Sequence, residues 1–363
     1  MTTSEDAYRV LVLDDDPDIA EYTRTVLERR GGCQVLSLND PRLAVAALED
    51  FQPDVVVTDI EMPGMSGLEV LALMREAQPG LPVIVMTAHV SIDYAVRALR
   101  SQADEFLTKP ISHPELISIV RRLASQWRSR READLELDRA AEVQRGLLPR
   151  QLVALDGYQL DGDCTPARAV GGDFFDWYPV SDGAAFTVAD VMGKGIGAAI
   201  IAATVRSVLR SGAGGPDLGQ VMSVADSSLE PDLERAGAFV TLFHARLNAA
   251  LGEVRYVDAG HGLSLVVRAA GGTKRLATTS FPLGSGFGGG WREHILTLLP
   301  GDTLVSVSDG VLDLFDGTLA SLDEVERIAR SASSARDIVD ALLERASHGA
   351  PDDVTVVVLR RDL

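Results

Sequence analysis

Several acidic side chains in the first third of the chain directly follow strand-like segments, where they could share a cation and accept a phosphoryl group. Asp14 and Asp15 come after the apolar run "YRVLVL", and Asp59 ends "DVVVTD". A hydroxyl and an ammonium group end two later runs, at Thr87 and Lys109. Converging carboxylates repel one another unless a hard cation such as Mg²⁺ lies among them. Asp59 could then be the nucleophile, with Lys109 and Thr87 contacting the phosphoryl oxygens.

A second group of acids occupies strand ends from Tyr158 onward. Its members are Asp173 after a Gly-Gly pair, Asp190 at the end of "FTVAD", Asp309 at the end of "LVSVSD", and Asp352 and Asp353 before "VTVVVL". Any one of them could be a turn former or a helix cap. Together, without a histidine or cysteine cluster, they form a set of hard oxygen ligands suited to Mg²⁺ or Mn²⁺. Their number predicts two ions roughly 4 Å apart that activate water for attack on a phosphoryl group.

The segments that carry the first group predict an α/β fold. Amphipathic segments with helical spacing, at 17–30 and 67–77, separate short β-branched runs. These five runs are "YRVLVL", "CQVLSL", "DVVVTD", "LPVIVMT" and "EFLTKP". Buried strands that alternate with helices indicate a doubly wound parallel sheet covered on both faces. A ligand site in such a sheet lies beyond the carboxyl ends of the strands, which is where the acids fall.

The segments that carry the second group predict an α+β sandwich, because strands cluster around a few helices without strict alternation. The helical stretches are 197–212 and 218–230. The strand-like stretches are 184–191, 239–247, 253–260, 263–269, 302–310 and 353–360.

A long helix is predicted between the two parts, since no Gly or Pro interrupts the chain from Pro114 to Gly146. Its length would be about 50 Å. One seam with a spacing of three and four residues runs along it, through Val120, Leu123, Trp127, Arg130, Asp134, Leu137, Ala141, Gln144 and Leu148. This seam favours a parallel homodimer that polar positions in its middle would weaken. The alternative is the last helix of the first domain followed by a solvated linker.

Charge and composition exclude several classes of protein. The formal net charge of −19 disfavours binding to nucleic acid, whose phosphates it would repel. No apolar run is long enough for a membrane span, and the polar, acidic start does not resemble a signal peptide. The two cysteines, Cys33 and Cys164, lie far apart without metal-binding spacing. A cytoplasmic protein with reduced thiols is expected.

The first part resembles the receiver domain of two-component response regulators over roughly residues 8–122. The motifs that carry the resemblance are "LVLDDDPDI", "VVTDIEMPGMSGLEVL", "VIVMTAH" and "FLTKPI". It implies that Asp59 is the phospho-acceptor and that a sensor histidine kinase donates the phosphoryl group. It further implies a Mg²⁺ pocket formed by Asp14, Asp15, Asp59 and the backbone carbonyl of Glu61. The implied switch residues are Thr87, Phe106 and Lys109.

The last part resembles the metal-dependent serine/threonine phosphatases of type 2C, in the bacterial branch that controls sigma factors and their antagonists. The motifs "PARAVGGDFFD", "VADVMGKGIGAA", "YVDAGHG", "LVSVSDGVLD" and "PDDVTVVVLR" carry it over roughly residues 145–361. It implies an α/β/β/α sandwich and two Mn²⁺ or Mg²⁺ ions. The implied ligands are Asp173, Asp190, the Val191 carbonyl, Asp309 and Asp352, with Asp353 left open. Arg168 is a candidate for binding phosphate, and Gly171 and Gly172 would let the backbone approach a metal held by Asp173.

The combined expectation is a receiver domain over 1–122, a helical linker and possible coiled coil over 123–148, and a phosphatase domain over 149–363. Such a response regulator would dephosphorylate a phosphoserine or phosphothreonine protein, with an anti-sigma-factor antagonist as the expected substrate. The alternative is a catalytically silent adaptor that sequesters or delivers a sigma factor or its regulator. Retention of the acids disfavours that alternative.

Overall fold

A computed structural model describes residues 7–88, 103–149, 151, 153–215, 217–287, 290–347 and 349–363. The chain divides into two compact units, Met1–Glu136 and Leu137–Leu363, and each is described by itself. Among the described residues, no helix combines the length and the apolar character needed to cross a bilayer.

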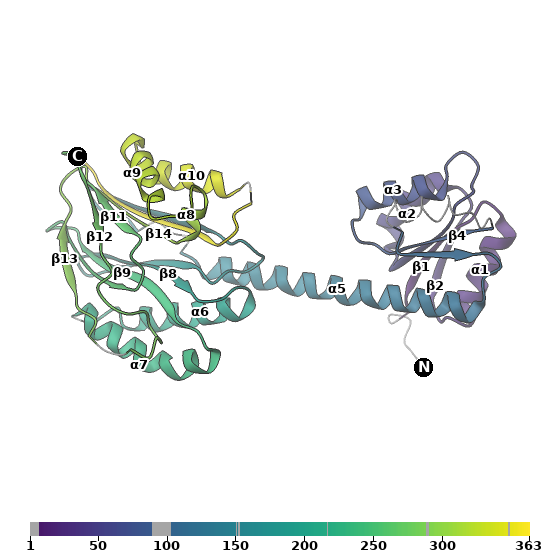
Figure 1. The fold of residues 1–363 in the computed structure, drawn as a ribbon, viewed down its shortest axis with the longest axis horizontal. Helices are drawn as coiled ribbons and strands as arrows, with labels where there is room; N and C mark the ends of the chain where they lie inside the picture. The colour runs from purple at the N-terminus through teal and green to yellow at the C-terminus, as the bar shows by residue number, and fades with distance from the viewer. Residues whose placement is uncertain are drawn as a thin grey trace. The chain divides into compact units, whose positions relative to one another are not determined.

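The first unit contains a parallel sheet in the order β2-β1-β3-β4-β5 (Figure 1). Its strands are β1 (Arg9–Leu13), β2 (Gln34–Leu38), β3 (Val55–Asp59), β4 (Val83–Thr87) and β5 (Glu105–Thr108). The central strands β3 and β4 are buried along their whole length, which explains their unbroken β-branched runs. The predicted five-stranded parallel sheet is confirmed.

Helices cover both faces of this sheet. They are α1 (Pro17–Arg29), the 3₁₀ turn η1 (Pro41–Leu43), α2 (Ala44–Phe51), α3 (Gly67–Ala77) and the start of α5 (His113–Leu147). Leu27 of α1 and Val120 of α5 pack with one face, whereas Leu48 of α2 and Leu71 of α3 pack with the other. This arrangement is doubly wound, as the sequence predicts.

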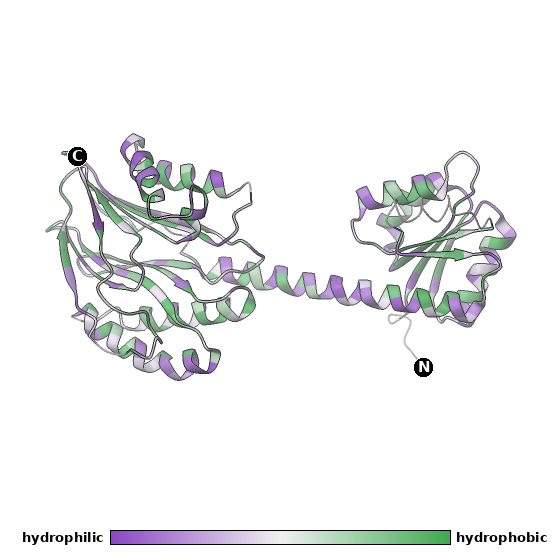
Figure 2. Ribbon diagram, viewed as in Figure 1, coloured by the Kyte–Doolittle hydropathy of each residue, from purple (hydrophilic) through white to green (hydrophobic). Residues whose placement is uncertain are grey.

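Helix α5 is a single element, His113–Leu147, whose two ends have buried positions in different units. Val120 and Leu123 belong to the core of the first unit, and Ala141 is buried in the second. Figure 2 shows hydrophilic colouring along the middle of α5, where Arg130 and Asp134 are exposed. The apolar start of the predicted dimer seam is therefore engaged within the chain, and dimerisation through the seam stays a prediction.

The second unit contains two antiparallel sheets, in the orders β13-β10-β9-β8-β7 and β12-β11-β14-β15-β6 (Figure 1). The first sheet has β7 (Phe174–Val180), β8 (Gly183–Val191), β9 (Val240–Asn248), β10 (Glu253–Ala259) and β13 (His294–Thr297). The second has β6 (Tyr158–Thr165), β11 (Ser264–Val267), β12 (Thr273–Leu276), β14 (Thr303–Val307) and β15 (Val354–Arg361).

Three apolar cores give this unit four layers. Helices α6 (Ile196–Ser211) and α7 (Leu218–Ala236) pack on the β8 sheet. The two sheets pack on each other through side chains such as Phe186 and Val357. On the outer face of the β15 sheet lie α8 (Gly310–Asp313), α9 (Ser321–Ser331) and α10 (Ala335–Ala346). The α/β/β/α sandwich is confirmed.

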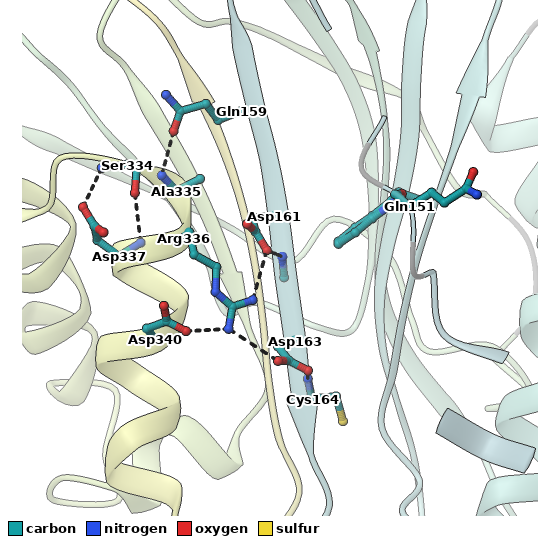
Figure 3. Close-up of polar contacts among 12 residues, drawn as sticks. Gln151, Gln159, Asp161, Asp163, Cys164, Ser334, Ala335, Arg336, Asp337 and Asp340 are labelled. Atoms are coloured by element: carbon teal, nitrogen blue, oxygen red, sulfur yellow. Dashed lines mark hydrogen bonds and ion pairs between the residues drawn. The ribbon is translucent and has the colours of Figure 1, made fainter. Parts of the chain in front are cut away.

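Polar contacts fix α10 on β6 (Figure 3). Ser334 and Asp337 form a capping box at the start of α10, and the Ala335 N–H donates to Gln159 Oε1 at 2.9 Å. Arg336 pairs with Asp340 on the helix and lies 3.5 Å from Asp161 of β6. Helices α9 and α10 were not singled out from the sequence, because their amphipathic segments carry none of the candidate ligands.

Candidate functional sites

The receiver acids meet at the carboxyl edge of the parallel sheet. Asp59 is the last residue of β3, and Asp14 follows the neighbouring strand β1. Asp16 has a different role, because its side chain caps α1 by accepting the N–H groups of Asp18 and Ile19. The cap starts the helix at Pro17 and leaves Asp14 and Asp15 as the acids beside Asp59.

Lys109 joins the two buried acids. Its Nζ lies 2.8 Å from Asp14 Oδ2 and 2.7 Å from Asp59 Oδ2. Ligand oxygens of Asp14, Asp15 and Asp59 all lie within 4.8 Å of one another, a spacing that suits one hard cation. Lys109 thus supplies the positive charge that this acidic pocket needs.

Burial and pairing oppose each other in this pocket. Burial raises the pKa of Asp14, although the hydrogen bond from Lys109 acts to lower it. Burial tends to lower the pKa of Lys109, but hydrogen bonds to Asp14 and Asp59 raise it overall. The lysine is therefore charged at neutral pH and its removal would leave two carboxylates facing each other.

Of the other predicted receiver positions, Thr87 and Glu61 lie at this edge and Phe106 lies within β5. Thr87 ends β4 and is fully buried, and Phe106 on β5 is half-buried. The Glu61 N–H lies 3.5 Å from Asp59 Oδ1, so the backbone of Glu61 is beside the acceptor. Gly67 was missed from the sequence: a Cβ there would lie 1.9 Å from the Asp59 carbonyl oxygen. Only glycine lets α3 begin this close to β3.

Four of the phosphatase acids come together from the two sheets of the sandwich. Asp173 directly precedes β7 and Asp190 lies near the end of β8; the register Phe174↔Ala189 makes them neighbours. Asp309 follows β14, and Asp352 lies just before β15, the strand paired with β14. Within the part of the chain that the structure describes, no three of these acids share the 4.8 Å spacing of the receiver pocket, so they are spread more widely.

Burial and mutual repulsion raise the pKa values of three of these acids. Burial raises the pKa of Asp190 to about 6, and Asp309 and Asp352 add to the shift. Burial also raises the pKa of Asp173 far above its usual range, with Asp190 the next contributor. The pKa of Asp309 is raised by burial and by Asp352. Mutual repulsion of this kind is what a bound cation relieves.

The structure gives the two adjacent acids before β15 different environments. Asp353 is buried, and its carboxylate accepts the N–H groups of Ala167 at 2.8 Å and Gly172 at 2.7 Å. Asp352 is about one-third exposed and lies 2.8 Å from Lys194 Nζ. The backbone contacts of Asp353 favour Asp352 as the ligand of the pair, and which of the two binds metal stays a prediction.

The two glycines before Asp173 permit close packing of protein groups. A Cβ at Gly171 would lie 2.4 Å from Asp353 Oδ2, and a Cβ at Gly172 would lie 2.7 Å from the Val191 carbonyl oxygen. Both glycines thus allow close contacts within the chain, and the expectation that they let the backbone approach a metal held by Asp173 stays a prediction. Gly172 does bring the Asp173 loop against the predicted carbonyl ligand, Val191.

One cationic side chain pairs with Asp352, and a second lies near the first. Lys194, in the glycine-rich turn between β8 and α6, pairs with Asp352. The sequence motifs do not predict this contact. Arg168 is exposed and close enough to influence the charge of Lys194. Asp176 lies apart from the site, because Arg210 of α6 binds its carboxylate through two hydrogen bonds of 2.5 and 2.7 Å.

The carboxylate of Asp173 has an oxygen atom that a divalent cation could bind. Asp173 Oδ2 is buried and has no hydrogen-bond partner among the residues that the structure describes. A buried carboxylate oxygen without a partner is costly unless a cation or a proton satisfies it. Because all the surrounding candidates are oxygen donors, Mg²⁺ and Mn²⁺ fit the set.

Comparison with known families gives the same two parts. The response regulator receiver domain matches residues 10–121, and the family described as Stage II sporulation protein E (SpoIIE) matches residues 181–362. Since the second match covers half of the chain, the protein belongs to the SpoIIE family and carries a receiver domain ahead of that region.

Among solved structures, the SiaA-PP2C domain of Pseudomonas aeruginosa is similar with a TM-score of 0.56. It is 23% identical, and the match covers 64% of this chain and 99% of that domain, which shows a shared fold.

Curated relatives match a shorter stretch. The probable transcriptional regulatory protein TcrX of Mycobacterium tuberculosis is 40% identical over 114 residues, 31% of this chain and 48% of the relative. NtrC of Proteus hauseri is 38% identical over 126 residues, which are 34% of this chain and 26% of that relative. The chain thus spans half or less of the length of these relatives.

Proposed function

We propose that this protein is a response regulator whose output domain is a metal-dependent protein phosphatase under the control of receiver phosphorylation. The observation that carries the proposal is the unpartnered, buried Asp173 Oδ2 among carboxylates from two facing sheets. Membership of the SpoIIE family and the PP2C fold support the same activity. The receiver domain supports the mode of control.

In the phosphatase site, each residue has a role that follows from its position. Two Mn²⁺ or Mg²⁺ ions would be held by Asp173, Asp190, Asp309, Asp352 and the Val191 carbonyl. When bound, such ions activate a water molecule and neutralise charge on the phosphoryl group. Asp353 holds the Gly172 backbone in place for Asp173. Arg168 and Lys194 lie where they can attract the phosphate of a substrate.

In the receiver site, Asp59 would attack the phosphoryl group supplied by a sensor histidine kinase. Asp14 and Asp15, with Asp59 and the Glu61 carbonyl, would hold Mg²⁺. Lys109 is already within hydrogen-bond distance of Asp59 and would pair with the transferred group. Thr87, at the end of β4, and Phe106, within β5, would report the change to the rest of the domain.

The proposed substrate is a phosphoserine or phosphothreonine in a cytoplasmic protein, specifically an anti-sigma-factor antagonist. Resemblance of the five phosphatase motifs to the bacterial sigma-regulating branch supports this choice. The acidic net charge and the absence of basic clusters in those motifs do not favour nucleic acid. A homodimer through α5 remains part of the proposal.

Hydrolysis of a small chromogenic phosphate ester with Mn²⁺ tests the activity. Asp309→Ala removes a proposed ligand, and Asp340→Ala removes an exposed acid on α10 as a matched control. We expect the wild type and Asp340→Ala to hydrolyse the ester with Mn²⁺ and to lose activity with a chelator. Asp309→Ala should lose at least about a hundredfold. Mn²⁺ binding without hydrolysis of the ester or of any phosphoprotein would favour the adaptor alternative instead.

A further inference from the structure

Gln144 lies in the last turn of α5, within the second unit, and its side chain binds both backbone groups of Gly171 in the same unit. Its Nε2 donates to the Gly171 carbonyl oxygen at 2.8 Å, and its Oε1 accepts the Gly171 N–H at 3.1 Å. A primary amide side chain can offer a donor and an acceptor at once, here to the C=O and the N–H of the same residue. Gln144 therefore fixes Gly171 both in position and in orientation.

Gly171 belongs to the loop that presents Asp173, and the loop is held from a second side. Asp353 accepts the N–H groups of Ala167 and Gly172, on either side of Gly171. The Cα of Gly171 lies so close to this carboxylate that a Cβ would clash with it at 2.4 Å. The loop is thus clamped between α5 and the start of β15, and a displacement of Gly171 must move Asp173, two residues on.

The same helix carries residues that are tied to the receiver core. Val120 is fully buried there, and Arg128 pairs with Asp54 and donates to the Ala7 carbonyl. From Val120 to Gln144 the helix rises about 36 Å without a break. Helix α5 therefore continues without a break from residues of the receiver core to Gln144.

We propose that Gln144 is a positioning residue through which helix α5 sets the conformation of the Asp173 loop. When Gln144 holds Gly171, Asp173 faces Asp190 as described; when the amide pair is broken, the loop is released and Asp173 leaves the ligand set. The consequence for catalysis rests on the proposed phosphatase function, but the clamp itself is a property of the metal-free chain. Gln144 contacts no reacting group, so its effect is on position alone.

Hydrogen exchange of the metal-free, full-length chain tests the clamp directly. Gln144→Ala removes both hydrogen bonds, and Gln144→Glu keeps an acceptor but places a carboxylate against the Gly171 carbonyl. Gln126→Ala changes an exposed glutamine on the same helix and is the matched control. We expect amide exchange in segment 168–173 to become about tenfold faster in both Gln144 variants and to be unchanged in Gln126→Ala. Unchanged exchange in Gln144→Ala would overturn the clamp.

Two further readouts separate positioning from mere structural support. In an Asp59→Asn background, which removes an acid of the receiver pocket, Gln144→Ala should weaken Mn²⁺ binding about tenfold or more. With Asp59 intact, beryllofluoride and Mg²⁺ should change exchange of segment 168–173 in the wild type and not in Gln144→Ala. A beryllofluoride response that persists in Gln144→Ala would overturn the role in coupling. If the wild type binds no Mn²⁺ and hydrolyses nothing, the phosphatase proposal fails, while the exchange rates still decide the clamp.

Discussion

Asp353 Oδ2 accepts the backbone N–H of Gly172 at 2.7 Å, across a separation of 181 residues in the sequence. The same carboxylate binds the Ala167 N–H with its other oxygen. Its neighbour Asp352 instead lies at the surface, beside Lys194. The two consecutive aspartates thus have different contacts. Asp353 binds the loop before β7, and we propose Asp352 as the ligand of a cation.

This division predicts different effects for the two amide variants. Asp353→Asn turns one acceptor oxygen into a donor that opposes a backbone N–H, and we expect the phosphatase unit to lose about 1–3 kcal/mol of stability. Asp352→Asn breaks an exposed ion pair and should change stability by less than about 0.5 kcal/mol. Calorimetry and Mn²⁺ titration would measure both. Asp352→Asn should lose metal affinity without losing stability, and equal destabilisation by the two variants would contradict the assignment.

Metal binding is predicted to depend steeply on pH between about 5 and 7. The pKa of Asp190 is about 6 in the metal-free chain, and Asp173 and Asp309 also have raised pKa values because they are buried together. Since cations bind the ionised carboxylates, Mn²⁺ affinity should rise with pH and level off above the pKa of these groups. Titration in the Asp59→Asn background would follow the phosphatase acids. An affinity that does not change from pH 5 to pH 7 would rule out these acids as ligands.

The same shift predicts how metal-free stability changes with pH. Asp190 has a folded-state pKa of about 6 against an ordinary value of 3.8, so its contribution is fully present below pH 3.8 and is lost as pH rises through 6. In Asp190→Asn this contribution disappears. The stability gain of Asp190→Asn over the wild type should therefore be larger at pH 7 than at pH 5. Calorimetry in the presence of a chelator measures the difference, and the opposite trend would contradict burial and carboxylate repulsion as the cause of the raised pKa.

Two buried histidines predict that stability falls as pH falls, which is opposite to the effect of Asp190. His244 accepts or donates a 2.8 Å hydrogen bond with Thr187, and burial lowers the pKa of His244 and of His261 to about 4. Their contribution is present above the ordinary value of 6.5 and is lost as pH falls through 4. His244→Gln should destabilise the phosphatase unit less at pH 5 than at pH 7.5. A penalty that is the same at both pH values would show that His244 does not stay neutral.

Lys109 is predicted to stabilise the receiver most strongly when no Mg²⁺ is present. Lys109→Ala leaves Asp14 and Asp59 facing each other and should cost about 3 kcal/mol without Mg²⁺. Added Mg²⁺ should recover most of this loss because it replaces the missing charge. Arg42→Ala, which breaks an exposed pair with Asp40, is the control and should leave stability nearly unchanged. A loss in Lys109→Ala that Mg²⁺ does not recover would argue against a shared cation site.

Both folds could be predicted from the sequence because most of their strands are continuous apolar runs. The candidate acids directly follow several of these runs. β3 and β4 are buried on both faces, so their β-branched segments and the residues that end them are visible without a structure. β6, in contrast, alternates buried and half-buried residues and contains two aspartates, and it was not recognised. β12 has a single buried residue, which leaves too little apolar signal to identify it.

The contacts that distinguish one acid from another could not be predicted, because they depend on backbone groups brought together by the fold. Nothing local separates Asp352 from Asp353; the distinction comes from the N–H groups of Ala167 and Gly172. The spacing of residues along the helix assigns Gln144 to the predicted dimer seam. That spacing cannot show that the Gln144 amide binds the Gly171 backbone. A Gly-Gly pair before an acid was the available signal that a tight backbone approach occurs there.

The central claim is that the receiver controls a metal phosphatase, and one rate comparison tests it. Hydrolysis of the chromogenic ester with Mn²⁺ would be measured for the full-length wild type with and without beryllofluoride, beside Asp59→Asn under the same conditions. We predict that the rate of the wild type changes about fivefold or more and that the rate of Asp59→Asn does not change. An equal response in both proteins, or a response in neither, would contradict control of the phosphatase through Asp59.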